Sequence, residues 1–227
     1  MRRLSRRNNL DRCATCRMHS TLCICALLPK LATRTRVSLL VHYRELRKPT
    51  NTGQLAAQCL STSTIEVIGE EDHRAVLPRI EDHEEPLLLY PAEDAVPLDV
   101  YANYAYPIVL IVPDGSWRQA HKMRKRVPGL AEIPCVTLPD TGPTEYRLRS
   151  EHHPGGLATF EAIARALRIV EADGVAIETA LMNVFRIMVD RTLWLRGRLA
   201  DTAVTGGLPD AAREQNPRST PAPRREP

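Results

Sequence analysis

Asp114 combines a side chain that can move a proton with a position in the sequence where ligands commonly bind. It follows Ile-Val-Leu-Ile-Val at residues 108–112, an apolar run without polar alternation. Such a run is typical of a strand that is covered on both faces, as in a parallel sheet. Pro113-Asp114-Gly115-Ser116 then predicts a turn, because Pro and Gly interrupt strands. Ligands bind at such turns in open α/β sheets, although Asp114 could also be a simple helix cap.

A basic helix is expected directly after this turn. Trp117 opens it, and all of its charged positions are cationic, namely Arg118, Lys122, Arg124, Lys125 and Arg126. A cationic helix beside a ligand-binding turn suits phosphate groups. Trp117 can stack on an exposed base, as aromatic side chains do in RNA recognition, or it can be a core residue that packs at the start of the helix. The sequence leaves both roles open.

Four of the six cysteines lie close together, as Cys13, Cys16, Cys23 and Cys25. Thiolates are soft ligands that bind Zn²⁺ in tetrahedral sets of four, so we expect a structural zinc with no open position for catalysis. The spacing of the second pair is shorter than usual, and His19 could replace one of its members. Free thiols are the alternative.

Charge is distributed unevenly along the 227 residues, whose formal net charge is +4. Residues 1–12 hold five arginines against one aspartate, and residues 117–150 hold seven Lys and Arg against three acidic residues. Residues 66–99 instead hold eleven acidic residues against two arginines. Basic segments of this kind attract nucleic-acid phosphates, and solvated surface charge is the alternative.

The expected cellular compartment follows from the targeting and membrane-spanning segments that are not found in this sequence. No run of about 18 apolar residues occurs, so no membrane span is expected. The N-terminal arginines are not followed by an apolar segment, which argues against a secretory signal, while an organellar transit peptide stays open. Clustered cysteines in a chain without a secretory signal favour reduced thiols. We therefore expect a cytoplasmic protein.

Strands and helices alternate, which predicts an α/β fold. Strands are expected at residues 36–42, 65–68, 87–90, 108–112 and 135–138, and helices at about 54–62, from 117, at 160–172 and at about 175–199. The chain is divided into a flexible basic arm (1–12), a zinc-knuckle module (13–30), a main domain (31–204) and a disordered tail (205–227).

Three segments at expected strand ends carry the unusual polar content, residues 42–53, 113–117 and 139–159. Strand-end loops of one sheet can converge on one site. The helix that starts near Asn51 and Thr52 can hold an anion on its first N–H groups, or these two residues can simply cap it. The motifs of Rossmann dinucleotide enzymes, P-loop NTPases, zincins and α/β-hydrolases do not occur.

The chain resembles the DTW-domain family through an ordered set of motifs over about residues 10–200. Asp114-Gly115-Ser116-Trp117 matches the family's D-x-[TS]-W. The other matching motifs are Cys13-x2-Cys16, Cys23-x-Cys25, His42-x2-Glu45, Thr50-Asn51-Thr52-Gly53, Trp117-x2-Ala120, Tyr146-x-Leu148-Arg149 and Thr159-x-Glu161-Ala162. Two positions depart from the family pattern, because Tyr43 stands where Pro is common and Ala158 where Ser is frequent.

This resemblance implies a SPOUT-like α/β fold, a mostly parallel sheet flanked by helices with a small N-terminal zinc-binding module of four cysteines. Residues 31–204 would then be the catalytic DTW domain. The implied activity is that of a tRNA-uridine aminocarboxypropyltransferase. Such enzymes use S-adenosylmethionine to place a 3-amino-3-carboxypropyl group on N3 of a tRNA uridine, in the variable loop for bacterial members, and release methylthioadenosine. Asp114 would be the general base for the N3 proton.

The resemblance and the three loops together give the expected binding residues. Those for the cofactor are Leu110, Val112, Pro113, Gly115, Leu138, Tyr146, Leu157, Thr159 and Glu161. Those for RNA are His42, Glu45, Arg47, Thr50, Asn51, Thr52, Trp117, Arg118, Lys122, Arg147 and Arg149. Either of the last two arginines could instead hold the cofactor carboxylate.

Two other functions stay open. A SPOUT-type RNA methyltransferase is the alternative enzyme, and a zinc-bearing RNA-binding protein without catalysis is the alternative of another class. Under the transferase hypothesis, Asp114→Ala abolishes transfer and leaves folding largely unaffected. The oligomeric state and the tRNA species are not given by the sequence.

Overall fold

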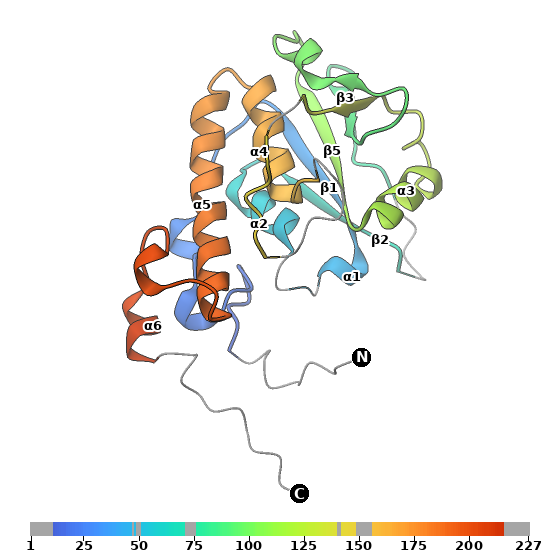
Figure 1. Cartoon of the computed structure of the whole chain (residues 1–227). Coiled ribbons are helices and arrows are strands. Elements are labelled where there is room, and N and C mark those ends of the chain that lie inside the picture. The colour runs from blue at the N-terminus through green and yellow to red at the C-terminus, as the bar shows by residue number, and fades with distance from the viewer. Residues whose placement is uncertain are drawn as a thin grey trace, which may run out of the picture. The chain divides into compact units, whose positions relative to one another are not determined.

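The computed structural model describes residues 11–46, 48, 51–70, 76–139, 142–148 and 156–215 (Figure 1). Its chain forms two compact units. Residues 29–144 and 152–182 make up the first, called here the sheet unit. Residues 1–28, 145–151 and 183–227 make up the second, called here the cysteine unit.

The sheet unit is built on six parallel strands. They are β1 (Arg36–His42), β2 (Thr64–Ile68), β3 (Glu85–Leu89), β4 (Val96–Pro97), β5 (Ile108–Asp114) and β6 (Cys135–Thr137). Their order across the sheet is β2-β1-β5-β3-β6-β4. β1 and β5 lie inside the sheet and are almost fully buried, as their continuous apolar runs require. This parallel sheet with helices confirms the predicted α/β class.

The direction of the chain reverses between β1 and β5. From β1 the chain passes through α1 (Tyr43–Leu46) and α2 (Thr52–Cys59) to β2 at the edge. From β5 it passes through α3 (Trp117–Arg126) to β6, on the other side. Because crossovers between parallel strands are right-handed, α2 and α3 cover opposite faces. The ends of β1 and β5 therefore form a topological switch point, the place where α/β sheets bind ligands.

Each face of the sheet has its own helices. α4 (Thr159–Val170) lies beside α2 in front of β1 and β5 (Figure 1), and its residues Phe160, Ile163 and Leu167 are fully buried. On the other face α3 closes a core whose fully buried members are Leu40, Leu88, Val109, Ile111 and Leu130. Neighbouring residues of β5 thus face different helices, as the alternation of a strand requires.

β5 extends two residues beyond its apolar run, which corrects the expectation that Pro113 ends the strand. Pro113 pairs with Leu40 and Asp114 with Val41 of β1. On the other side, pairing between β3 and β5 stops at Ile111. Past that point β5 has a strand on one side only, so a residue without an N–H is tolerated.

The cysteine unit contains the second half of α5 (Gly174–Leu195), which begins in the sheet unit. The helix ends at Leu195 and not at 199, because Gly197 adopts a positive φ of 69°. The N–H of Gly197 donates to the carbonyl of Trp194 and that of Arg198 to Leu193, at 2.8 and 2.9 Å. This pair of bonds is a Schellman motif, which favours glycine.

Two predicted boundaries are corrected in this unit. Residues 205–215, expected to be disordered, include the helix α6 (Asp210–Glu214) with buried Leu208 and Ala212. The 13–30 segment is not a separate module, because its first part packs in one unit with the end of α5. The arm at 1–10 and the tail at 216–227 lie outside the described residues. No helix in the described part of the chain is long and apolar enough to cross a membrane.

Candidate active site and metal centre

Asp114 is the last residue of β5, at the switch point of the sheet, and it is only 5% exposed. Its side chain lies on the face of the sheet that α2 and α4 cover. There Asn51 Nδ2 donates to Asp114 Oδ2 at 2.5 Å, and Thr159 Oγ1 donates to Oδ1 at 2.6 Å. One donor comes from the start of α2 and the other from the start of α4. Both donors stabilise a charged carboxylate.

Asp114 is not the cap of the helix that follows it. That role belongs to Ser116, whose side chain accepts from the N–H of Gln119, while Gln119 Oε1 accepts from the N–H of Ser116 at 2.7 Å. This is a complete capping box. The helix-cap alternative for Asp114 is therefore wrong.

The start of α2 approaches Asp114 so closely that one position needs a glycine. A Cβ at Gly53 would lie 2.7 Å from Asp114 Oδ2 and 2.8 Å from Leu39 Cδ2, closer than packed atoms come. Gly53 was not among the expected site residues. A glycine in the first turn of a helix, where it costs stability, was the available signal.

Glu161 is fully buried at the start of α4 and holds the loop that follows β6. Its Oε2 accepts from Thr144 Oγ1 at 2.6 Å and from the N–H of Ala158 at 2.9 Å. Arg165, one turn later, lies 3.9 Å from Glu161 Oε1 and donates to the carbonyl of Pro143 at 3.1 Å. Glu161 therefore supports the loop at 142–144, where a direct cofactor contact had been expected.

The other residues expected at the cofactor divide by burial. Leu110 and Val112 are buried in the sheet, so only their backbone could meet a ligand. Pro113, Leu138 and Leu157 are half-buried, and Gly115 is exposed. Tyr146 belongs to the cysteine unit, where its ring centroid lies 5.9 Å from that of Phe185.

His42 ends β1 beside Asp114 and lies among positive charges. Its ring stacks on Tyr43 at 4.8 Å, and its Nδ1 accepts from the N–H of Arg44 at 3.2 Å. Burial lowers the pKa of His42, and the charges of Arg44, Lys48 and Lys122 lower it further against the opposing effect of Glu45. Side chains of α1 and α3 therefore share one electrostatic environment around this histidine.

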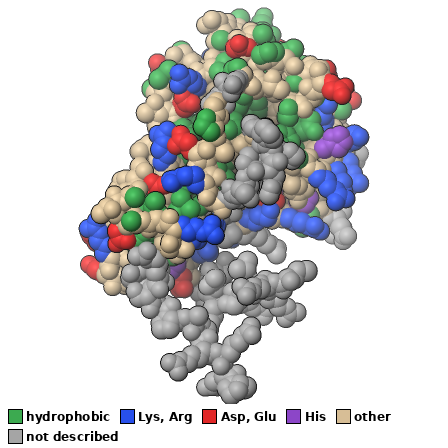
Figure 2. Space-filling model, in the orientation of Figure 1, with side chains coloured by type: hydrophobic (Ala, Val, Ile, Leu, Met, Phe, Trp, Pro, Cys, Tyr) green, Lys and Arg blue, Asp and Glu red, His purple; other side chains and the backbone are tan. Residues whose placement is uncertain are grey.

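The surface around His42, formed by α1 and α3, is basic and is called here the basic face. Lys and Arg side chains gather over α3 and beside α1 (Figure 2), and Arg118 and Lys122 are exposed. Trp117 is 48% exposed, which excludes the alternative that it packs into the core. Glu45 pairs with Lys48 at 2.5 Å. The expected RNA-binding residues His42, at the end of β1, and Lys122, in the helix after β5, therefore lie on the same side of the sheet unit.

The remaining RNA candidates have other positions. Thr52 is buried, and its Oγ1 accepts from the N–H of Phe160 at 3.4 Å, which links α2 to α4. Arg147 belongs to the cysteine unit and pairs with Asp190. Arg47, Thr50 and Arg149 lie outside the described residues.

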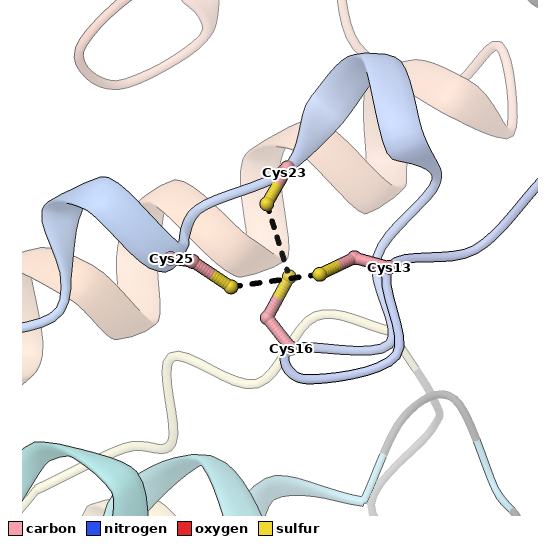
Figure 3. Close-up of side chains that lie close together, drawn as sticks. All are labelled: Cys13, Cys16, Cys23 and Cys25. Carbon is pink, nitrogen blue, oxygen red and sulfur yellow. Dashed lines mark hydrogen bonds between the residues drawn. The ribbon is translucent and has the colours of Figure 1, made fainter.

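Cys13, Cys16, Cys23 and Cys25 point toward one centre (Figure 3). Their Sγ atoms all lie within 4.8 Å of one another, with 3.5 Å between Cys13 and Cys25 and 3.8 Å between Cys16 and Cys23. A tetrahedral zinc with Zn–S bonds of ~2.3 Å needs Sγ atoms about 3.8 Å apart, so the four residues fit this ion. His19 is not in the group, because its Nδ1 caps the 3₁₀-helix Ser20–Leu22.

The environment of the cysteines is electrostatically mixed. A hydrogen bond from the backbone N–H of Cys16 lowers the pKa of Cys13 to about 6, while burial raises the pKa of Cys25 to about 12. Burial also lowers the pKa of Arg191, against the opposing charges of Cys23 and Cys16. A bound divalent cation would favour the thiolate form of all four cysteines.

Comparison with known proteins covers most of the chain. The model of the DTW domain family matches residues 10–193. The chain is 30% identical over 172 residues to a Drosophila melanogaster protein named tRNA-uridine aminocarboxypropyltransferase 2, which covers 73% of this chain and 68% of that protein. It is 28% identical to Arabidopsis thaliana tRNA-uridine aminocarboxypropyltransferase A, over 78% of this chain and 79% of that protein. For the Macaca fascicularis tRNA-uridine aminocarboxypropyltransferase 2 the identity is 28%, over 74% and 59%. No solved structure matches the chain.

Proposed function

The chain belongs to the DTW domain family, and on this premise we propose that it is a tRNA-uridine aminocarboxypropyltransferase. The proposed reaction transfers the 3-amino-3-carboxypropyl group of S-adenosylmethionine to N3 of a tRNA uridine, in the variable loop, and releases methylthioadenosine. The observation that carries the proposal is the placement of Asp114. The segment that resembles the family motif ends a central strand at the switch point, with its carboxylate held and its tryptophan exposed.

Asp114 is the proposed general base. Uridine N3–H is a weak acid and must lose its proton before the nitrogen can attack a carbon. A carboxylate in fixed geometry within hydrogen-bond reach can accept that proton. The bonds from Asn51 and Thr159 leave the carboxylate little freedom to rotate. Placement of this kind contributes to the rate by avoiding reorganisation during reaction.

The co-substrate would be held by the strand-end loops around Asp114. When bound, its sulfonium activates the carbon that N3 attacks, so the protein needs no nucleophile of its own. The negative charge of the buried Asp114 carboxylate suits the positively charged sulfonium of S-adenosylmethionine, which would approach the same strand end. Backbone groups of Pro113, Gly115 and Leu138 are proposed to line this cradle, with Leu157 opposite.

The basic face of α1 and α3 is proposed to bind tRNA phosphates. Exposed Arg118 and Lys122 supply charge beside the strand end, and Trp117 supplies a surface on which a base can stack. The cysteines would hold a structural zinc. We also propose that the protein acts in the cytoplasm, where thiols stay reduced.

A labelling experiment tests the proposed reaction. Purified protein is incubated with tRNA and with S-adenosylmethionine that carries label either in the methyl group or in the carboxypropyl carbons. The proposal predicts carboxypropyl label on uridine and none from the methyl group. Methyl label would instead support an RNA methyltransferase, and tRNA binding without either label would support a protein that only binds RNA.

A further inference from the structure

We infer that Asn51 and Thr159 are positioning residues that hold the Asp114 carboxylate from both sides, an inference that rests on the proposed function. The sequence had suggested RNA contact for Asn51 and cofactor contact for Thr159. The structure instead places each of their donors on a different oxygen of Asp114, at 2.5 and 2.6 Å. We call these three side chains the carboxylate clamp.

The amide of Asn51 has one orientation, because both of its ends are used. Its Oδ1 accepts from the N–H of Gln54 at 2.9 Å and so caps α2. Rotating the amide by half a turn would turn an N–H₂ group toward that N–H and an oxygen toward Asp114. Both new contacts would be repulsive, so the helix cap fixes the donor that faces Asp114.

Thr159 gives its hydroxyl to Asp114 at the start of its own helix. It is the first residue of α4, and Ala158 before it has no side-chain oxygen with which to cap the helix. No side-chain oxygen at position 158 is therefore available to hydrogen-bond the hydroxyl of Thr159 in place of Asp114. A second bond, from the N–H of Phe160 to Thr52 Oγ1 at 3.4 Å, joins the same two helix starts. This bond holds together the starts of α2 and α4, which supply the two donors of the clamp.

The clamp has a consequence for chemistry that a purely structural role lacks. The clamp gives a hydrogen bond to each oxygen of Asp114, which favours the charged form and fixes the plane of the carboxylate. Weakening either bond should change the pH at which the carboxylate gains a proton. It should also lower the turnover number more than it raises the KM for either substrate.

Asn51→Asp is the sharpest test, because Asp caps helices as well as Asn does. The variant keeps the acceptor for Gln54 and replaces the donor to Asp114 with a second carboxylate. Two carboxylates in contact share a proton, so the acidic limb of the kcat/KM profile should move up by about one pH unit or more. Asn51→Ser keeps a cap acceptor, removes the same donor and adds no charge, so its profile should move in the same direction by a smaller amount.

Thr159 is tested by an isosteric pair. Thr159→Val removes the hydroxyl and should lower kcat roughly tenfold or more, whereas Thr159→Ser keeps it and should stay within about threefold. Thermal unfolding of each variant checks that α4 remains folded. A higher KM for S-adenosylmethionine with unchanged kcat in Thr159→Val, or weaker tRNA binding with an unmoved pH profile in Asn51→Asp, would overturn the inference.

Failure of the clamp and failure of the proposed reaction can be told apart. The carboxyl carbon of Asp114 can be followed by ¹³C NMR as pH is varied, without any substrate. The clamp predicts that this resonance titrates at higher pH in Asn51→Asp than in the wild type, whichever group the enzyme transfers. The same midpoint in both proteins would refute the clamp, even if the carboxypropyl label reaches tRNA.

A buried guanidinium beside the cysteines carries a second, independent inference. Arg191 of α5 is 5% exposed, and its Nη1 donates to the carbonyls of Leu22 and Cys23 at 3.3 and 2.9 Å. Its Nε is buried without a hydrogen-bond partner. No carboxylate in the described part of the chain forms an ion pair with it. A buried cation in this position needs another source of negative charge.

We propose that the metal-bound cysteines are that source, so that Arg191 is their counter-cation. Four thiolates around one Zn²⁺ leave an excess of negative charge, which an adjacent cation offsets. Arg191 also holds the backbone at Cys23, a ligand of the group. Outer-shell residues of this kind change metal affinity by roughly 10- to 100-fold.

Zinc release to an excess of a coloured chelator tests this role. Arg191→Met should release zinc about tenfold faster or more than the wild type, and Arg191→Lys, which keeps the charge, much less. Arg186→Met is the matched control on the same helix, because Arg186 pairs with Glu145 at 2.6 Å. Its release rate should equal that of the wild type.

A second background separates charge from packing. Cys25→His keeps a zinc ligand and removes one negative charge, so Arg191→Met should accelerate release by a smaller factor there. An equal factor in both backgrounds would contradict charge compensation. A zinc-release rate in Arg191→Met equal to that of the wild type would also contradict it. So would a release rate in Arg191→Lys as high as that in Arg191→Met.

Discussion

Replacing Asp114 in two ways should separate its structural from its chemical role. Asp114→Ala removes a buried carboxylate that accepts hydrogen bonds at 2.5 and 2.6 Å from Asn51 and Thr159. Hydrogen bonds to charged groups contribute about 1.5–3 kcal/mol each, and water that enters the space recovers part of this. We expect a loss of about 2–4 kcal/mol in the free energy of unfolding. This expected loss differs from the sequence-based prediction that the change leaves folding largely unaffected, and an unfolding measurement decides between the two.

Asp114→Asn keeps the shape and both hydrogen bonds. The amide oxygen can accept from Asn51 Nδ2, and the amide N–H₂ can donate to the hydroxyl of Thr159, which then turns to accept. We therefore expect a loss of about 1 kcal/mol or less. What the variant lacks is a group that takes a proton. Removing a general base costs about 10²–10⁴-fold in rate, equivalent to roughly 3–5 kcal/mol in the barrier.

The assay combines urea unfolding, followed by circular dichroism, with single-turnover transfer of label to tRNA. The expected pattern is a stable but inactive Asp114→Asn beside a destabilised and inactive Asp114→Ala. A near-wild-type rate for Asp114→Asn would refute the general-base assignment. Equal destabilisation of the two variants would refute the account of the hydrogen bonds.

Further predictions concern the metal, the thiols, the RNA and pH. Cys13→Ser should lose zinc and destabilise the cysteine unit, and elemental analysis that finds no zinc in the wild type would contradict the metal centre. Burial raises the pKa of Cys59 to about 12, so iodoacetamide at about pH 8 should leave this thiol unmodified in the folded protein, as peptide mass spectrometry can check. Lys122→Ala should weaken tRNA binding and reduce the slope of log affinity against log salt by about one, and an unchanged slope would place Lys122 away from phosphates. The hydrogen bond from Arg36 lowers the pKa of Glu84 below its unfolded value, so its stabilisation is present above the unfolded pKa and lost as pH falls through the folded one. Glu84→Gln should therefore flatten the acidic loss of stability in denaturant titrations between about pH 5 and 3, and parallel curves would contradict this.

The sequence was sufficient for the features that depend on local pattern. Continuous apolar runs located β1 and β5, and their parallel pairing brings the loop after residue 42 and the turn at 113–117 to one edge. Cysteine spacing predicted a four-thiol group that the structure brings together. These inferences needed only strand polarity and ligand chemistry.

The side-chain partners of Asp114 could not be read in this way. Asn51 and Thr159 are separated from Asp114 by 63 and 45 residues, so their meeting depends on register and helix placement. The need for a glycine at position 53 follows only from the short distance between its backbone and Asp114 Oδ2, which the sequence does not show. The polar composition after residue 205 resembled disorder, yet Thr205 donates to Asp190 Oδ2 at 2.6 Å. Tertiary contacts decide such segments.

The central claim is that Asp114 serves the transfer of a carboxypropyl group to uridine in tRNA. Nucleoside mass spectrometry after reaction with doubly labelled S-adenosylmethionine measures this directly, with wild type and Asp114→Asn in parallel. The account predicts a uridine that carries the carboxypropyl label in the wild type only. Methyl label on the nucleoside, or equal carboxypropyl label from both proteins, would contradict it.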